Sequence, residues 1–211
     1  MTCPIASYMD VALLNPELTR SEVEAILDQL IPLKPCTFCI RPSDIPLVKP
    51  ICREHRIGLC VVLGFPHGHQ LPECKADEAQ RYLSQGVDEI DMVCNIGAVR
   101  SGDWDRVKEI FETCFLTEAE IRKLVEVCIE AQADFVKTST GFNGEGAQDH
   151  HVKLMLETAA HRIQVKPSGG IATKERAENL IGLGATRLGV GYKSALAICG
   201  EGDASADAGA Y

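Results

Sequence analysis

Residues 135–142 read Phe135-Val136-Lys137-Thr138-Ser139-Thr140-Gly141-Phe142, which places a lysine inside an apolar, β-branched run and follows it with polar residues and a glycine. We predict a strand over 135–139 that gives way to a loop at Gly141. Such a strand buries Lys137, and a buried ammonium group that is not paired loses its proton readily. A neutral amine at the end of a strand is what Schiff-base chemistry requires. For Lys137 taken alone, a structural ion pair or a solvated strand face is the commoner explanation.

Strand and helix patterns alternate along the whole chain on either side of this stretch. Eight apolar runs read as strands, and their centres lie about 21 to 30 residues apart. The helical stretches between them carry apolar residues at helical spacing, most clearly after Thr117, which forms a capping box with Glu120. This alternation predicts an α/β fold of the (β/α)8 TIM-barrel type, with an open, doubly wound sheet as the alternative. We predict the strands at 8–14, 37–40, 59–64, 89–94, 110–115, 135–139, 163–166 and 187–191.

Composition and charge limit the class of protein. The chain has 211 residues, 45% of them hydrophobic and 24% charged, which suits a single globular domain over 1–211. Its formal net charge of −9 argues against a general binder of nucleic acid or anionic membranes. Several of the ten cysteines lie in apolar runs, and no second pair matches the spacing of Cys36 and Cys39, so we expect free thiols and no metal site. No signal peptide or membrane-spanning stretch is visible, so we expect a cytoplasmic protein whose small, polar tail from about 201 is mobile.

Charged residues mark the ends of several predicted strands, among them Asp10, Asp91, Lys137 and Lys166. The two lysines are 29 residues apart, about one βα unit, so we expect them on adjacent strands with their side chains able to approach. Repulsion between two ammonium groups in a dry pocket lowers the pKa of one, which predicts one nucleophilic lysine and one fixed positive charge. Asp91 is placed to move protons or to hold a water, with a plain salt bridge to one lysine as the alternative.

Glycine-rich segments follow the last two predicted strands. Gly169-Gly170 comes directly after the first of them, and Thr173 then caps a helix, so backbone N–H groups are exposed at a helix start. Gly189 and Gly191 repeat the pattern at the final strand. Loops at these two positions are the usual phosphate site of such barrels, so we predict a phosphate-bearing ligand, although a plain turn is the commoner reason for a Gly-Gly pair.

The chain carries three specific motifs, namely the stretch Phe135–Phe142, Val165-Lys166-Pro167-Ser168-Gly169-Gly170 and Asp88-Glu89-Ile90-Asp91. Weaker pieces are Tyr8-Met9-Asp10, Leu63-Gly64-Phe65-Pro66-His67-Gly68 and Tyr211. With these motifs the sequence resembles the deoxyribose-phosphate aldolase family, the class I enzymes of the DeoC type, over nearly the whole chain. The resemblance implies reversible cleavage of 2-deoxy-D-ribose 5-phosphate to acetaldehyde and D-glyceraldehyde 3-phosphate, in deoxyribonucleoside catabolism. It implies a small phosphosugar substrate and no cofactor or metal, because the protonated imine is itself the electron sink, and it leaves room for a homodimer or higher homo-oligomer.

The resemblance also implies roles for individual residues. By similarity, Lys137 forms the Schiff base, Lys166 depresses the pKa of Lys137, and Asp91 handles protons together with a water. Tyr211, on the tail, assists proton exchange at the enamine carbon. The residues implied in binding the sugar and its phosphate are Asp10, Cys39, Thr140, Gly141, Gly169, Gly170 and Gly189.

Several positions depart from the family pattern. Ala12 stands where the family usually has Thr, and Ala172 stands where it usually has Arg, which removes a positive charge for which Lys193 is a candidate replacement. Only about 15 residues run from Asn95 to Glu109, so we expect a shortened unit between the fourth and fifth strands. We therefore hypothesise a shortened aldolase with weakened stability and reduced activity. The alternatives are a non-catalytic or weakly active relative that keeps the phosphosugar pocket, and a different class I sugar-phosphate lyase.

Overall fold

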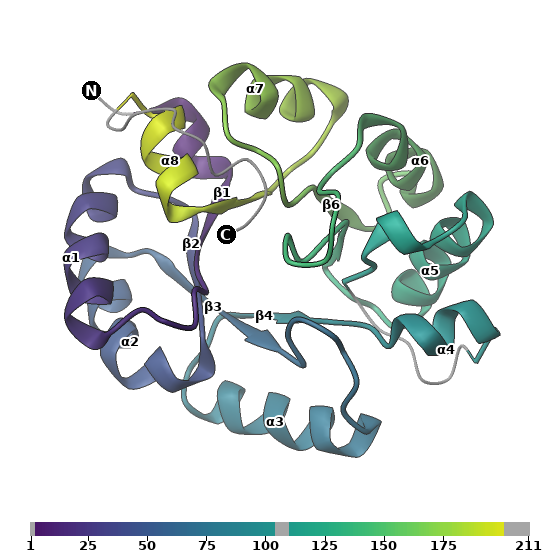
Figure 1. Ribbon diagram of the computed structural model, residues 1–211, viewed down its shortest axis with the longest axis horizontal. Coiled ribbons are helices and arrows are strands. Elements are labelled where there is room, and N and C mark those ends of the chain that lie inside the picture. Colours follow the sequence, from purple (N-terminus) through teal and green to yellow (C-terminus); the bar gives the residue numbers. More distant parts are fainter. Residues whose placement is uncertain (1–2, 104–109, 201–211) are drawn as a thin grey trace.

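Parallel strands form the centre of the molecule and helices surround them (Figure 1). The computed structural model describes residues 3–103 and 110–200. Within them the strands form a five-stranded sheet in the order β4-β3-β2-β1-β7 and a two-stranded sheet of β5 and β6. The strands are β1 Met9–Leu13, β2 Thr37–Ile40, β3 Gly58–Leu63, β4 Glu89–Met92, β5 Phe135–Lys137, β6 Gln164–Lys166 and β7 Leu188–Gly191. These bounds lie close to the predicted ones, except that β4 ends at Met92 instead of Cys94 and β5 ends at Lys137 instead of Ser139.

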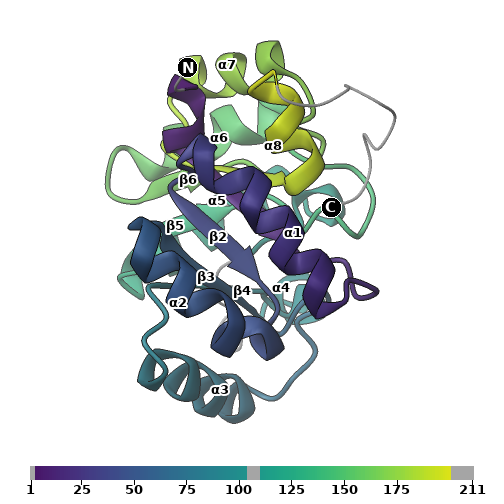
Figure 2. The same ribbon diagram turned by 90° about the vertical axis from the view of Figure 1, so that its left-hand side faces the viewer.

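The α-helices lie outside the strands and alternate with them along the chain, as expected for the (β/α)8 type of fold. Figure 2 shows α1 and α2 side by side in front of β2. The predicted capping box of Thr117 with Glu120 is present, and Thr19 forms a second one with Glu22. None of the described helices is long and apolar enough to cross a membrane. The helices are α1 Arg20–Leu30, α2 Ile45–His55, α3 Pro72–Ser84, α4 Ile96–Ser101, α5 Glu118–Glu130, α6 Asp149–Ala159, α7 Lys174–Leu183 and α8 Tyr192–Ile198.

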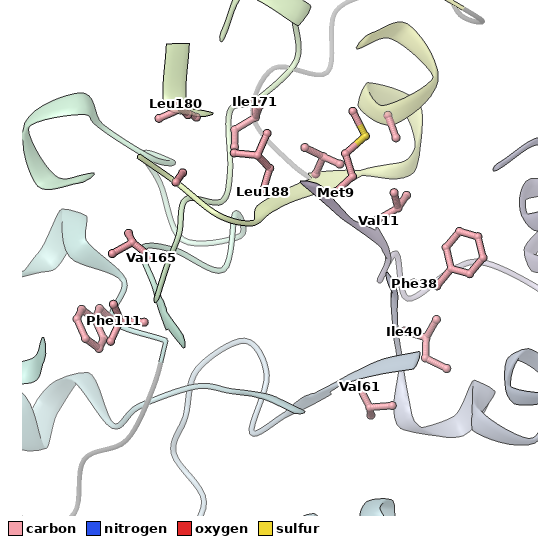
Figure 3. Close-up of a cluster of buried hydrophobic side chains, with 14 of the residues drawn as sticks. Met9, Val11, Phe38, Ile40, Val61, Phe111, Val165, Ile171, Leu180 and Leu188 are labelled. Carbon is pink, nitrogen blue, oxygen red and sulfur yellow. The ribbon is translucent and has the colours of Figure 1, made fainter. Parts of the chain in front are cut away.

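Side chains alternate between the two faces of each strand, and the two faces have different compositions. The outer face joins a large apolar cluster that includes residues of the surrounding helices, and each large side chain buried there contributes about 1.5 to 3 kcal/mol. Strand members of that cluster labelled in Figure 3 are Met9, Val11, Phe38, Ile40, Val61, Val165 and Leu188. The inner face holds a smaller apolar set of Ala12, Leu14, Cys39, Cys60 and Val62 together with buried charged groups. Because the outer face supplies most of the apolar packing, the inner face is available for polar chemistry.

The expected strand at 110–115 is the main correction to the predicted fold. Among the described residues only Ile110 pairs there, through single-residue bridges to the chain after β4 and to the end of β5. Glu112 adopts a left-handed backbone conformation with a φ of 53°, and Thr113–Phe115 form a 3-10 turn. Because a left-handed residue turns the chain out of the extended path, a regular strand cannot run through this segment.

The chain from Ile110 nevertheless hydrogen-bonds to both of its neighbours. The Ile110 amide donates to the Met92 carbonyl at 2.8 Å, and the Cys94 amide donates to the Ile110 carbonyl at 3.1 Å. On the other side, the Phe111 amide donates to the carbonyl of Lys137 at 3.1 Å. Strand-type hydrogen bonds are therefore present beside Lys137, although the shortened unit predicted from the sequence was expected to weaken this region.

The unit before Ile110 is short, as the sequence predicted. Its helix α4 has 6 residues, whereas α5 has 13. The Asn95 side chain accepts a hydrogen bond from the Ala98 amide at the helix start, and Gly102 ends the helix with a φ of 72°. A short helix, capped at both ends, is thus the helical part of this crossover in the described part of the chain.

Candidate active site

Four charged side chains meet on the inner face of the strands. The Lys137 ammonium donates to Asp91 Oδ2 at 2.7 Å, and the Lys166 ammonium donates to Asp91 Oδ1 at 2.8 Å and to Asp10 Oδ2 at 2.6 Å. Lys137 and Lys166 are register partners in β5 and β6, which confirms their expected place on adjacent strands. All four side chains are buried, so their mutual pairing replaces the water that each charge has lost.

Pairing decides the charge states in this cluster. Burial raises the pKa of Asp91, but the charges and hydrogen bonds of Lys137 and Lys166 outweigh it and hold that pKa well below its ordinary value. Burial lowers the pKa of Lys166, but Asp10 and Asp91 outweigh it and raise that pKa well above its ordinary value. Lys166 is therefore a fixed positive charge. Asp91 is an ionised carboxylate that accepts hydrogen bonds from both lysines, whereas a plain salt bridge would join it to only one.

Two thiols complete the wall beside the carboxylates. Cys39 and Cys60 are register partners in β2 and β3, and the Cys39 thiol donates to Asp91 Oδ2 at 3.9 Å. The hydrogen bond with Cys60 lowers the pKa of the Cys39 thiol, but burial and the carboxylates of Asp10 and Asp91 together outweigh it, so that pKa is raised. Ligand atoms of the two thiols, Asp10 and Asp91 lie within 4.8 Å of one another, a spacing compatible with a metal ion. The Lys166 ammonium already contacts both carboxylates. We therefore interpret these four groups as partners of the two lysines and not as metal ligands.

A second polar group lies at the amino-terminal end of the strands. The Thr37 hydroxyl donates to Asp10, and the Arg187 guanidinium donates to Thr37 at 3.3 Å and to Glu89 at 2.9 Å. The same guanidinium lies 5.1 Å from the centre of the Phe135 ring. These contacts connect β1, β2, β4 and β5 on the amino-terminal side of the lysines and hold Asp10 in place.

The loop after Lys137 contains the predicted residues Thr140 and Gly141. The Thr140 hydroxyl donates to the Glu112 carboxylate, the Thr140 amide lies 3.2 Å from both oxygens of that carboxylate, and Asn143 Nδ2 donates to it at 3.1 Å. Sequence reasoning missed Glu112, which is 1% exposed. The signal was present, because Glu112 follows the apolar pair 110–111 just as Lys137 follows Phe135 and Val136.

The glycine turn after β6 packs closely against this loop. Gly169 and Gly170 have φ of +84° and +69°, values that L side chains rarely adopt. A Cβ on Gly146 would lie 2.2 Å from the Gly169 backbone, so only glycine fits at that approach. The amides of Gly141 and Gly170 donate no hydrogen bond within the described part of the chain. They remain available to a ligand anion.

Gly189 requires a correction. The phosphate-binding turn expected at Gly189 is absent, because Gly189 lies within β7, inside the strand predicted over 187–191, and its amide donates to the Pro167 carbonyl at 2.9 Å. Its N–H group is therefore already used, and its contribution is to let β7 pair with Ser168 and with Asp10. Tyr211 and the tail from about 201 lie outside the described residues.

A cavity of about 610 Å³ lies between β4 and β5. Asp91, Lys137 and Lys166 border it from the inner face, and Ile110 borders it from the shortened unit. The charged cluster thus lies next to the place where β4 and β5 are joined by one bridging residue.

Known proteins are similar to this chain over most of its length. Residues 116–183 match the family model described as DeoC/LacD family aldolase. The chain is 40% identical over 201 residues to the deoxyribose-phosphate aldolase of Mannheimia succiniciproducens, covering 88% of this chain and 90% of that protein. It superposes on the structure described as QR15, an aldolase, with a TM-score of 0.88 at 36% identity, covering 95% of this chain and 96% of that one. The deoxyribose phosphate aldolase from Aeropyrum pernix, described as a unique tetrameric structure, superposes with a TM-score of 0.84 at 27% identity, covering 93% and 89% of the two chains.

Proposed function

The chain belongs to the deoxyribose-phosphate aldolase family, and from this membership we propose that it reversibly cleaves 2-deoxy-D-ribose 5-phosphate to acetaldehyde and D-glyceraldehyde 3-phosphate. The reaction belongs to deoxyribonucleoside catabolism. The observation that carries the proposal is the pair of buried lysines, Lys137 and Lys166, that share the carboxylate of Asp91. A class I aldolase needs one amine that can lose its proton and a neighbouring charge that opposes regaining it.

In the proposed mechanism Lys137 is the nucleophile. The fixed charge of Lys166 opposes a second positive charge beside it, and Asp91 with a water carries protons to and from the site. The Lys137 amine attacks the substrate aldehyde carbon, and loss of water from the carbinolamine gives a protonated imine. A base removes the proton of the C3 hydroxyl, the C2–C3 bond breaks, and its electron pair moves into the imine. Glyceraldehyde 3-phosphate leaves, and protonation and hydrolysis of the remaining enamine release acetaldehyde and the free lysine.

The same proposal assigns the binding residues. Asp10, Cys39 and Thr140 line the sugar pocket, and the turn at Gly169-Gly170 receives the phosphate together with the Gly141 amide. Ala12 and Ala172 supply neither the hydroxyl nor the guanidinium that the family pattern has at these positions. Backbone amides therefore carry more of the phosphate contact in this chain. Lys193, on α8, is the candidate for a replacement charge.

Broader features of the protein remain part of the proposal. We propose one domain over 1–211, a cytoplasmic location, a small phosphosugar as the partner, and a role for Tyr211 in proton exchange at the enamine carbon. A homo-oligomer is supported by the description of the Aeropyrum pernix relative as tetrameric. The alternative of a crippled relative is disfavoured by the hydrogen bonds that the chain from Ile110 makes beside Lys137.

A turnover assay with the purified full chain tests the proposal. We expect release of glyceraldehyde 3-phosphate from deoxyribose 5-phosphate, followed with a coupled dehydrogenase. The Lys137→Met variant should lose at least about a thousand-fold in kcat, as enzymes do when a nucleophile is removed. Lys153, exposed on α6, is the matched control, and Lys153→Met should turn over like the unmodified chain. Absence of turnover in the unmodified, folded chain would favour the non-catalytic alternative.

A further inference from the structure

Glu112 is a buried carboxylate at the point where the shortened unit joins the catalytic strands. It is 1% exposed, and its φ of 53° places it in the left-handed region that L residues rarely adopt. A buried carboxylate is costly unless hydrogen bonds satisfy it, and a left-handed backbone adds about 1 to 2 kcal/mol. A residue held at that cost is a candidate for function.

All the hydrogen bonds described for the Glu112 carboxylate come from the loop that follows Lys137. The Thr140 amide lies 3.2 Å from both carboxylate oxygens, and the Thr140 hydroxyl donates to Oε2. Asn143 Nδ2 donates to the same oxygen at 3.1 Å. Bonds to a charged acceptor are stronger than neutral ones, so Glu112 is an anchor of this loop.

We propose that Glu112 is a positioning residue for substrate binding, acting through Thr140 and Gly141; the proposal rests on the proposed aldolase function. The Thr140 hydroxyl donates its hydrogen bond to Glu112, and its oxygen accepts a hydrogen bond from the Phe142 amide at 3.2 Å. This arrangement fixes the peptide of Gly141, which lies close to the Gly169 backbone. Glu112 thereby sets the distance between the Lys137 strand and the turn assigned to the phosphate.

The proposal predicts a split between two substrates. Deoxyribose 5-phosphate spans from Lys137 to the phosphate turn, whereas acetaldehyde reaches only the lysine. In Glu112→Ala we expect KM for deoxyribose 5-phosphate to rise about ten- to a hundred-fold, the effect typical of lost hydrogen bonds to a charged group. The rate at which borohydride traps acetaldehyde on Lys137 should stay within about three-fold of the unmodified chain. Glu112→Gln keeps the shape and one acceptor oxygen, so it should rescue most of KM.

A control variant separates positioning from loss of stability. Glu120 closes the capping box of α5 at the surface, so Glu120→Ala should lower thermal stability and leave both substrates unaffected. Thr140→Val removes the hydroxyl that Glu112 holds. If Glu112 acts through Thr140, the double variant Glu112→Ala/Thr140→Val should raise KM by less than the product of the increases in the two single variants.

A readout without turnover keeps the proposal distinct from the proposed function. Glu112 supplies the hydrogen-bond acceptors of the Thr140 amide, so that amide should exchange slowly with deuterium in the unmodified chain and at least ten-fold faster in Glu112→Ala. Unchanged exchange in Glu112→Ala, or a loss of acetaldehyde trapping in proportion to the rise in KM, would overturn the positioning role. An unmodified chain that protects Thr140 but cleaves no deoxyribose 5-phosphate would count against the proposed function alone.

Discussion

The strands β1 to β3 and the junction between β4 and β5 are held together in different ways. β1 pairs with β2, and β2 with β3, over four registered residue pairs each. β4 and β5 are connected through Ile110, which makes one bridge to each side. The first region follows from apolar, β-branched runs that the sequence displays plainly, and the second depends on a short segment that ends in a left-handed residue. Regular backbone pairing thus holds β1, β2 and β3 together, whereas the junction between β4 and β5 needs additional side-chain contacts.

The charged cluster supplies such links. The Lys137–Asp91 pair crosses from β5 to β4, and the Lys166–Asp10 pair crosses from β6 to β1. Both pairs join the two-stranded sheet to the five-stranded sheet, where backbone pairing is thinnest. The groups proposed for catalysis therefore also hold the two sheets together, and their removal should affect both properties.

Removal of Asp91 should have the largest effect. Asp91→Ala leaves two buried ammonium groups without their shared carboxylate, which should cost about 3 to 5 kcal/mol of unfolding free energy and nearly all turnover. Asp28, exposed on α1, is the control, and Asp28→Ala should change neither property. Urea unfolding and turnover measured on the same preparations test this. A variant of unchanged stability would show that the ion pairs do not join the sheets.

Matched isoleucines compare the two regions directly. Ile110 is 1% exposed at the junction and Ile40 is fully buried in β2, so each change to alanine should cost about 2 to 5 kcal/mol in urea unfolding. Only Ile110→Ala should also slow imine formation at Lys137, by about ten-fold, because it loosens the neighbouring strand. Equal slowing in Ile40→Ala would mean that Lys137 responds to overall stability and not to the junction.

The pH dependence of stability is a smaller test of the same links. Because the folded pKa of Asp91 is lowered, its stabilising contribution is present above the ordinary carboxyl value of about 3.9 and is lost as pH falls through the folded value. Between pH 7 and pH 3.5 the advantage of the unmodified chain over Asp91→Asn should shrink by about 0.5 to 1 kcal/mol. Urea midpoints of both chains at the two pH values measure it, and a constant difference would contradict the lowered pKa.

Some of this arrangement can be predicted from the sequence, and some cannot. The spacing of Lys137 and Lys166 predicts adjacent strands because one βα unit has a narrow range of lengths. The prediction of a strand at 110–115 was wrong because Glu112 has a left-handed backbone and bonds to a loop about 28 residues further along the chain. A local sequence pattern carries no information on such a contact. The prediction of a phosphate turn at Gly189 was wrong for a similar reason, because the Gly189 amide donates to the carbonyl of Pro167, which follows a different strand.

The most direct test of the account is borohydride reduction of the full chain in the presence of deoxyribose 5-phosphate, followed by peptide mass mapping of the modified lysine. We expect one substrate-derived adduct, on Lys137, and no adduct on Lys166, whose ammonium is held by Asp10 and Asp91. Lys137→Met should remove the adduct, and Lys153→Met should keep it. An adduct on Lys166, or none on the folded chain, would contradict the assignment of Lys137 as the Schiff-base lysine.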